Sequence, residues 1–122
     1  MLAQRATAFA SNITFRGSLR SSANFVGRGG AEPGEGKYCE LTLFVEKGII
    51  RKVRFETNGC PSSVAAGSAL CTLIEGRELE RCKELTPREL LLFIGGLPEG
   101  TEDAADRAIA ALKTAKEVEV NG

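Results

Sequence analysis

The side chains with the clearest potential for chemistry are four cysteines that lie more than ten residues apart: Cys39, Cys60, Cys71 and Cys82. None belongs to a Cys-x-x-Cys pair, so the spacing indicates neither a zinc ribbon nor the disulfide framework of a small secreted protein. The chain contains no histidine. Its absence removes the commonest metal ligand and every Ser-His or Cys-His nucleophile arrangement, which argues against a thiol enzyme.

Cys60 has the sequence setting that most favours reactivity. Asn58-Gly59 ends a β-branched run, and Pro61 opens a stretch of small residues that stops at Gly76. This pattern predicts a helix with Cys60 at the N-cap and Pro61 at the first helical position. A thiol there faces unpaired N–H groups and the positive end of the helix dipole, so it could be a nucleophile or a metal ligand. The alternative is a small buried cysteine that only packs.

The other three cysteines are interpreted as packing residues. Cys39 shares the apolar face of a predicted strand with two leucines. Cys71 lies three helical turns beyond Cys60, which places the two about 16 Å apart. Cys82 falls in a short predicted helix.

The balance of charge excludes a general attraction to nucleic acid or to an anionic membrane, because sixteen Lys and Arg match sixteen Asp and Glu over 122 residues. The length suits one domain. No apolar run reaches membrane-spanning length. No acidic residue precedes Glu32; this basic segment is expected as a strand or flexible arm, with an organellar transit segment as the alternative. A basic patch on the second predicted strand is either solvated or a contact for an acidic partner: Arg51, Lys52 and Arg54.

The elements that must position these residues begin with strands. Residues 27–36 hold five glycines and a proline, which predicts a loop unable to form a central strand. Alternation over 38–46, a Lys-Gly turn and a β-branched run over 49–57 predict a hairpin. A third strand is expected from residues 12–26.

Helices follow the strands. A short helix is expected over 78–84, Thr86 and Glu89 form a capping box, and Thr101 is expected to cap the last helix. The order predicts an α+β fold, with helices on one face of a small, mainly antiparallel three-stranded sheet. The predicted division is an N-terminal arm and Gly-rich loop, a core, and a C-terminal tail: 1–36, 37–117 and 118–122.

The chain resembles the NifU/IscU-like iron-sulfur cluster scaffolds over residues 33–116. The most specific part is Gly59-Cys60 at the end of a strand, followed by the small-residue helix and Glu75-Gly76. The matching segments are 41–46, 48–50, 53–55, 59–60, 65–70, 74–76, 79–80, 96–98 and 108–113. Such scaffolds assemble a cluster on three cysteines and an aspartate.

The resemblance implies a ligand set of which this chain keeps one cysteine. Cys60 occupies the position of the family's second cysteine. Glu35 occupies the position of the first cysteine and Lys37 that of the aspartate, while residues 101–103 correspond to the third cysteine and its neighbours. The implied metal ligands are Cys60, Glu35 and Asp103, with Lys37 and Thr101 beside them. Carboxylates in place of thiolates favour harder ions, so the implied cargo is iron or an iron-sulfur cluster held weakly, with zinc as an alternative.

The resulting hypothesis is a non-enzymatic, cytoplasmic iron-sulfur cluster assembly scaffold in which Cys60 receives sulfur or binds iron. The implied partners are a sulfur donor and acceptor apoproteins, and a homodimer could supply ligands from a second chain. The alternative is a scaffold fold that acts as a binding or regulatory subunit without a cluster. The segment that recognises a specialised Hsp70 in the family is reduced here to 97–100, which puts that docking in doubt.

Overall fold

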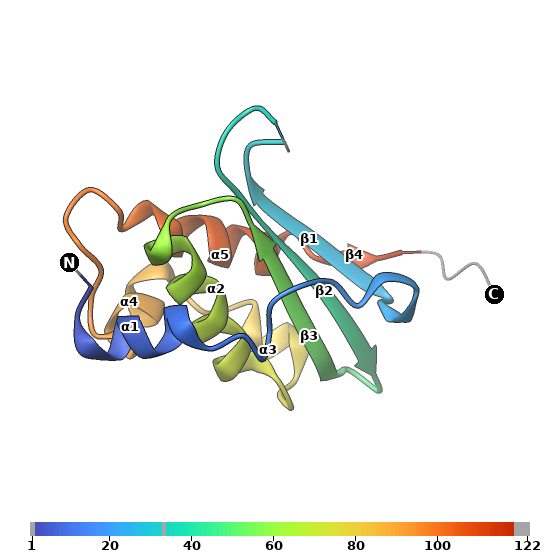
Figure 1. The fold of residues 1–122 in the computed structure, drawn as a ribbon. Coiled ribbons are helices and arrows are strands. Elements are labelled where there is room, and N and C mark those ends of the chain that lie inside the picture. Colours follow the sequence, from blue (N-terminus) through green and yellow to red (C-terminus); the bar gives the residue numbers. More distant parts are fainter. Residues whose placement is uncertain (1, 33, 119–122) are drawn as a thin grey trace.

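The structure is a computed structural model that describes residues 2–32 and 34–118, and Figure 1 shows a sheet with helices packed against it. The described elements in chain order are α1 (Gln4–Ser11), a short 3-10 helix (Arg20–Ser22), β1 (Phe25–Gly30), β2 (Tyr38–Glu46), β3 (Ile49–Thr57), α2 (Pro61–Ile74), α3 (Leu79–Cys82), α4 (Pro87–Ile94), α5 (Asp103–Lys113) and β4 (Lys116–Glu117). Within these residues, no helix is long and apolar enough to cross a bilayer.

The sheet is antiparallel with strand order β3-β2-β1-β4. The predicted hairpin is confirmed: β2 and β3 are joined by Lys47 and Gly48, whose positive φ angles of 54° and 79° suit a tight turn. The α+β prediction is therefore confirmed. The sheet has four strands rather than three, because the two residues of β4 pair with Phe25 and Val26 at the far edge.

Strand β1 contradicts the expectation that 27–36 is a loop throughout. Gly27 and Gly29 pair with Leu41 and Cys39 of β2, inside the sheet. A Cβ on Gly27 would lie 1.8 Å from the Ala111 carbonyl oxygen of α5, and one on Gly29 would lie 2.0 Å from the corresponding oxygen of Arg107. The glycines are there because α5 packs directly on the strand backbone. The third strand is thus 25–30 and not 12–26.

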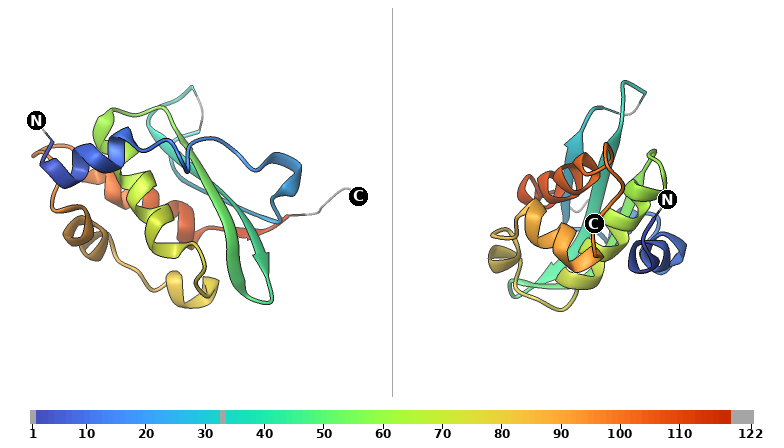
Figure 2. Two further views of the ribbon diagram at one scale, coloured as in Figure 1. Left: turned by 60° about the horizontal axis from the view of Figure 1, so that its bottom comes forward. Right: turned by 90° about the vertical axis from the view of Figure 1, so that its left-hand side faces the viewer.

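Helix α2 packs on the same face of the sheet as α5. Leu41 of β2 is paired on one side with Gly27, which faces α5, and on the other with Phe55 of β3. The Phe55 ring lies where a side chain on Gly67 of α2 would be, at 2.3 Å from an added Cβ. Figure 2 shows the helices gathered on one side of the strands. The core between them is closely packed, because helix and sheet meet at positions without side chains.

The first part of the basic N-terminal segment, Gln4–Ser11, is a helix rather than a strand or a flexible arm. Helix α1 packs along α2 with Ala6 fully buried, and Phe9 lies against Phe93 of α4 with ring centroids 5.4 Å apart. After α1 the chain runs along the edge of β3, where the Phe55 N–H donates to the Phe15 carbonyl at 2.8 Å. These first residues therefore contribute to the same core as the predicted core domain.

The helices after α2 follow the predicted signals, with one correction. Thr86 and Glu89 form the expected capping box at the start of α4. Thr101, however, does not cap α5: the N-cap is Glu102, and the Thr101 hydroxyl donates instead to the Pro98 carbonyl at 2.7 Å. The tail predicted for 118–122 lies outside the described residues except for its first residue.

The close contact between β1 and α5 makes a prediction about stability. Gly27→Ala should destabilise the protein by about 3 kcal/mol, at the upper end of overpacking costs, because the backbone oxygen of Ala111 cannot move aside as a flexible side chain would. The control is Val26→Ala, on the opposite face of the same strand, which should cost roughly 1 kcal/mol or less. Urea unfolding measures both, and equal stability of Gly27→Ala and the wild type would contradict this packing.

Candidate functional site

Cys60 lies in the short connection between β3 and α2, where it is the N-cap residue as predicted. Its carbonyl accepts hydrogen bonds from the N–H groups of Ser63 at 2.9 Å and Val64 at 3.2 Å, and Pro61 is the first helical residue. Cys60 is half-buried, so part of the residue remains exposed to solvent, unlike the three buried cysteines. A Cβ on Gly59 would collide with the Ser63 hydroxyl at 2.1 Å, which explains the glycine before Cys60.

The surroundings of Cys60 lower the pKa of its thiol. Partial burial opposes ionisation, but the N–H groups and hydroxyls of Ser63 and Ser62 favour the thiolate and outweigh it. This is the behaviour expected of a thiol at a helix N-terminus. Among the cysteines in residues 2–32 and 34–118, Cys60 is the one whose surroundings favour the thiolate, the form of cysteine that acts as a nucleophile or a metal ligand.

The other cysteines have the opposite electrostatic setting, because burial raises the pKa of each thiol. That of Cys39 rises to about 12, and that of Cys71 lies well above its usual range. Cys82 is affected in the same direction, mainly by burial. All three thiols are buried, as the packing interpretation predicted, and all four cysteines are free.

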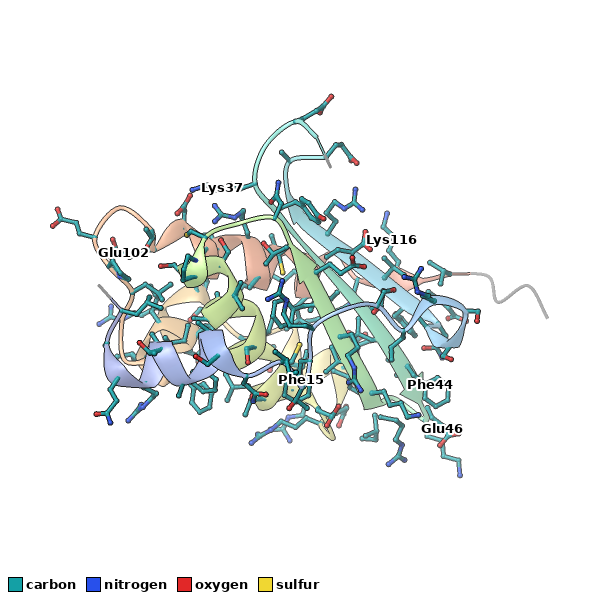
Figure 3. The ribbon with its side chains drawn as sticks, viewed as in Figure 1. Phe15, Lys37, Phe44, Glu46, Glu102 and Lys116 are labelled. Carbon is teal, nitrogen blue, oxygen red and sulfur yellow. The ribbon has the colours of Figure 1, made fainter. Side chains whose placement is uncertain are left out.

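The Asn58 side chain links the end of the β1–β2 connection to the turn that contains Cys60. Its side chain accepts a hydrogen bond from the Tyr38 N–H at 3.1 Å and donates one to the Gly36 carbonyl at 2.8 Å. Lys37 lies between these two anchored residues. Figure 3 shows its side chain extending from the β1–β2 connection towards the helical side of the sheet.

The start of α5 brings a third segment to the site through Asp103 and Arg107. The Arg107 guanidinium donates to the Asp103 carboxylate at 2.7 Å and to the Ser63 hydroxyl at 3.1 Å. This hydrogen bond and charge of Arg107, with a smaller effect of Lys37, hold the pKa of Asp103 below its usual range. Asp103 is consequently an ionised but already paired carboxylate, linked to Ser63 through Arg107.

Thr101 also reaches the site. Its hydroxyl oxygen accepts a hydrogen bond from the Ser62 hydroxyl at 2.9 Å, which joins the loop before α5 to the first turn of α2. The structure thus gathers four of the five candidate residues, since Cys60, Lys37, Thr101 and Asp103 come from three segments that meet at the start of α2.

Glu35 is the candidate that the structure does not bring in. It is exposed in the β1–β2 connection, which projects beyond the end of the sheet in Figure 1. Within residues 2–32 and 34–118, no ion pair or side-chain hydrogen bond joins Glu35 to the other candidates. In the same residues no group of three or more Cys, Asp or Glu side chains is arranged to hold a metal ion. One chain in this conformation therefore offers a single thiolate, not a four-ligand set.

Three residues of the site were missed by reasoning from sequence: Asn58, Ser63 and Arg107. Asn58 and Ser63 flank Cys60, so a search for thiolate-stabilising neighbours could have found them. Arg107 stands four residues after Asp103, a spacing that predicts an ordinary helical ion pair. Nothing in the sequence signals its second contact, with Ser63, which depends on how α5 packs.

Comparison with known proteins places this chain in a family. The chain is 38% identical over 80 residues, 66% of its length, to the nitrogen fixation protein NifU of Cereibacter sphaeroides, covering 32% of that protein. It is 32% identical over 77 residues to the iron-sulfur cluster assembly scaffold protein IscU of Aquifex aeolicus, covering 62% of this chain and 49% of the relative. The matched region is thus half or less of each relative's length.

Solved structures share the fold. A cluster assembly scaffold protein for the SUF system from Fervidobacterium islandicum superposes with a TM-score of 0.71 at 16% identity, covering 91% of this chain and 93% of the other. The N-terminal part of a NifU-like protein from Brucella abortus gives a TM-score of 0.61, also at 16% identity, covering 91% and 88%. The family model described as the NifU-like N terminal domain matches residues 4–118, and the chain belongs to that family.

Proposed function

We propose that this chain is a non-enzymatic iron-sulfur cluster assembly protein in which Cys60 receives sulfur or binds iron. The observation that carries the proposal is a solvent-accessible Cys60 at the N-terminus of α2, with its thiol pKa lowered, in a chain of the NifU-like N-terminal family. A thiolate can attack the outer sulfur of a donor protein's persulfide, which forms a persulfide on Cys60 and releases the donor's thiolate, and a thiolate is also a soft ligand that suits iron in such clusters.

The remaining candidate ligand residues suit weak and transient binding of iron or an iron-sulfur cluster. Asp103 supplies an oxygen that is paired with Arg107, while Glu35 stands apart on the projecting connection. Lys37 and Arg107 place positive charge near the site, which opposes a metal cation and favours a negatively charged sulfur on Cys60. Stable cluster binding would therefore need thiolates from a second chain or a partner.

The proposal implies partners of the cluster-assembly kind, namely a sulfur donor and acceptor apoproteins, with a homodimer as one source of missing ligands. We place the protein in the cytoplasm, since four free cysteines suit a reducing compartment. The packing of α1 into the core favours this location over a transit segment formed by the same residues.

A second candidate function is a binding or regulatory subunit that carries no cluster. The Asp103–Arg107 ion pair at 2.7 Å favours it, because an arginine here satisfies a carboxylate that a metal would otherwise bind. Lys37, where the family places an aspartate, acts in the same direction. The two candidates differ in whether Cys60 carries iron or sulfur at all.

Cys60 should be the first cysteine to be alkylated in the folded protein. Its lowered pKa means that the thiolate is populated at lower pH than for an ordinary thiol, whose pKa is about 8.5. The rate of iodoacetamide modification should therefore reach its half-maximum at lower pH, and Ser63→Ala should move that midpoint upward. Peptide mass spectrometry measures the order, and earlier modification of Cys39, Cys71 or Cys82 would show that Cys60 is not the functional thiol.

Anaerobic reconstitution with ferrous iron and sulfide should give a labile chromophore that depends on Cys60. Cys60→Ala should abolish the visible absorbance, whereas Cys82→Ala, the matched control in α3, should keep it. Rapid bleaching by a chelator is expected, because the carboxylates are poor substitutes for thiolates. A chain that stays colourless as monomer and as oligomer would favour the subunit without a cluster.

Restoring the family's ligands tests where the site lies. A variant with Glu35→Cys, Lys37→Asp and Thr101→Cys should bind a cluster more tightly than the wild type, as judged by resistance to chelator. A parallel variant carries Asp103→Cys in place of Thr101→Cys, because α5 begins at Asp103. If both variants fold and neither gains a cluster, the site does not lie on these loops.

A further inference from the structure

Arg107 is the best-anchored charge at the site. Its side chain is only 12% exposed, whereas that of its partner Asp103 is 58% exposed. One terminal nitrogen donates to Asp103 and the other to Ser63, so the guanidinium joins the first turn of α5 to the first turn of α2. A helical ion pair alone would need only the first of these contacts.

The fold provides a path for the Arg107 side chain. A Cβ on Gly30 would lie 2.9 Å from the Arg107 Cδ, so any larger residue there would push the side chain away. Gly30 has a φ of +88°, which also favours glycine. The last residue of β1 therefore leaves space for Arg107 to cross towards Ser63, close to Cys60.

The positive charges around Asp103 disfavour the binding of a metal ion there. Arg107 pairs with the carboxylate directly, and Lys37 adds a second positive charge from the β1–β2 connection. A divalent cation that used Asp103 and Cys60 would have to displace the guanidinium and then sit beside two cations. Repulsion over a few ångströms in a partly buried site is strong.

We infer that Arg107 is a specificity-determining residue that excludes divalent cations from Cys60 in the resting chain. Its guanidinium binds Asp103 and Ser63, and so occupies the position that a cation bound to both Asp103 and Cys60 would need. The inference rests on the proposed function, because it concerns the same thiol. It narrows that function: in the resting chain the Cys60 thiolate attacks the outer sulfur of a donor protein's persulfide, whose thiolate leaves, and iron binds only when Arg107 is displaced.

The test is anaerobic titration of the reduced 122-residue chain with Co²⁺, whose thiolate-to-metal charge-transfer absorption reports binding at cysteine. Arg107→Gln and Arg107→Met remove the charge and keep most of the side-chain stem. Both variants should bind Co²⁺ at least about tenfold more tightly than the wild type, because repulsion is lost and Asp103 is freed. Circular dichroism and thermal melting verify that each variant is folded, and the use of two substitutions guards against failure of one.

Two further variants test whether the change in Co²⁺ affinity is specific to Arg107 and depends on Asp103. Arg51→Gln removes an exposed cation that lies 3.7 Å from Glu46 on the β2–β3 hairpin, so it should leave Co²⁺ affinity unchanged. Asp103→Asn combined with Arg107→Gln should cancel most of the gain, because the carboxylate is the ligand that was freed.

Equal Co²⁺ affinity of the wild type and both Arg107 variants would overturn the inference. So would a gain that persists in the double variant, since Asp103 would then have no part in it. Neither result depends on iron-sulfide reconstitution of the wild type, which judges the proposed function separately. A chromophore that requires Cys60 would keep that function even if Arg107 proved to have no effect on metal selectivity.

Discussion

The arrangement of this molecule depends on the direct packing of α5 on β1 at two positions, Gly27 and Gly29, where the strand has no side chain. Added Cβ atoms on Gly27 and Gly29 would lie only 1.8 and 2.0 Å from backbone oxygens of α5, far closer than van der Waals contact permits. The helix axis can therefore lie nearer to the sheet than ordinary side chains would permit. That approach brings the first turn of α5 to the first turn of α2, where Arg107 meets Ser63.

The chemical character of the site follows from this meeting of two helix starts. Cys60 at the N-cap of α2 has a thiolate favoured by its neighbours, and Arg107 from α5 donates to Ser63, one of those neighbours. The same arginine is paired with Asp103, the carboxylate that we proposed as a candidate metal ligand. The structure thus brings together a turn that favours the Cys60 thiolate, an arginine and a paired carboxylate, an environment that we propose suits anionic sulfur better than a bare metal cation.

Local signals in the sequence account for the hairpin, the Cys60–Pro61 start of α2 and the Thr86 capping box, because each depends on neighbouring residues alone. The glycine strand could not be found in this way, since glycine runs indicate loops unless a helix packs on them, which is a tertiary fact. Helix α1 was missed for a similar reason: eight residues form a helix here by burying Ala6 against α2. Candidate residues near Cys60 were predictable from the family resemblance, whereas the second contact of Arg107 required the fold.

The most direct test of the account is the sulfur and iron content of the protein as purified under strictly anaerobic conditions. Native mass spectrometry, combined with iron and acid-labile sulfide analysis, should show added sulfur or iron on the wild type and none on Cys60→Ala. The account predicts that iron falls well short of a full cluster per chain, because one thiolate is available. Stoichiometric iron and sulfide that persist without Cys60 would contradict it, as would a wild type that never carries either element.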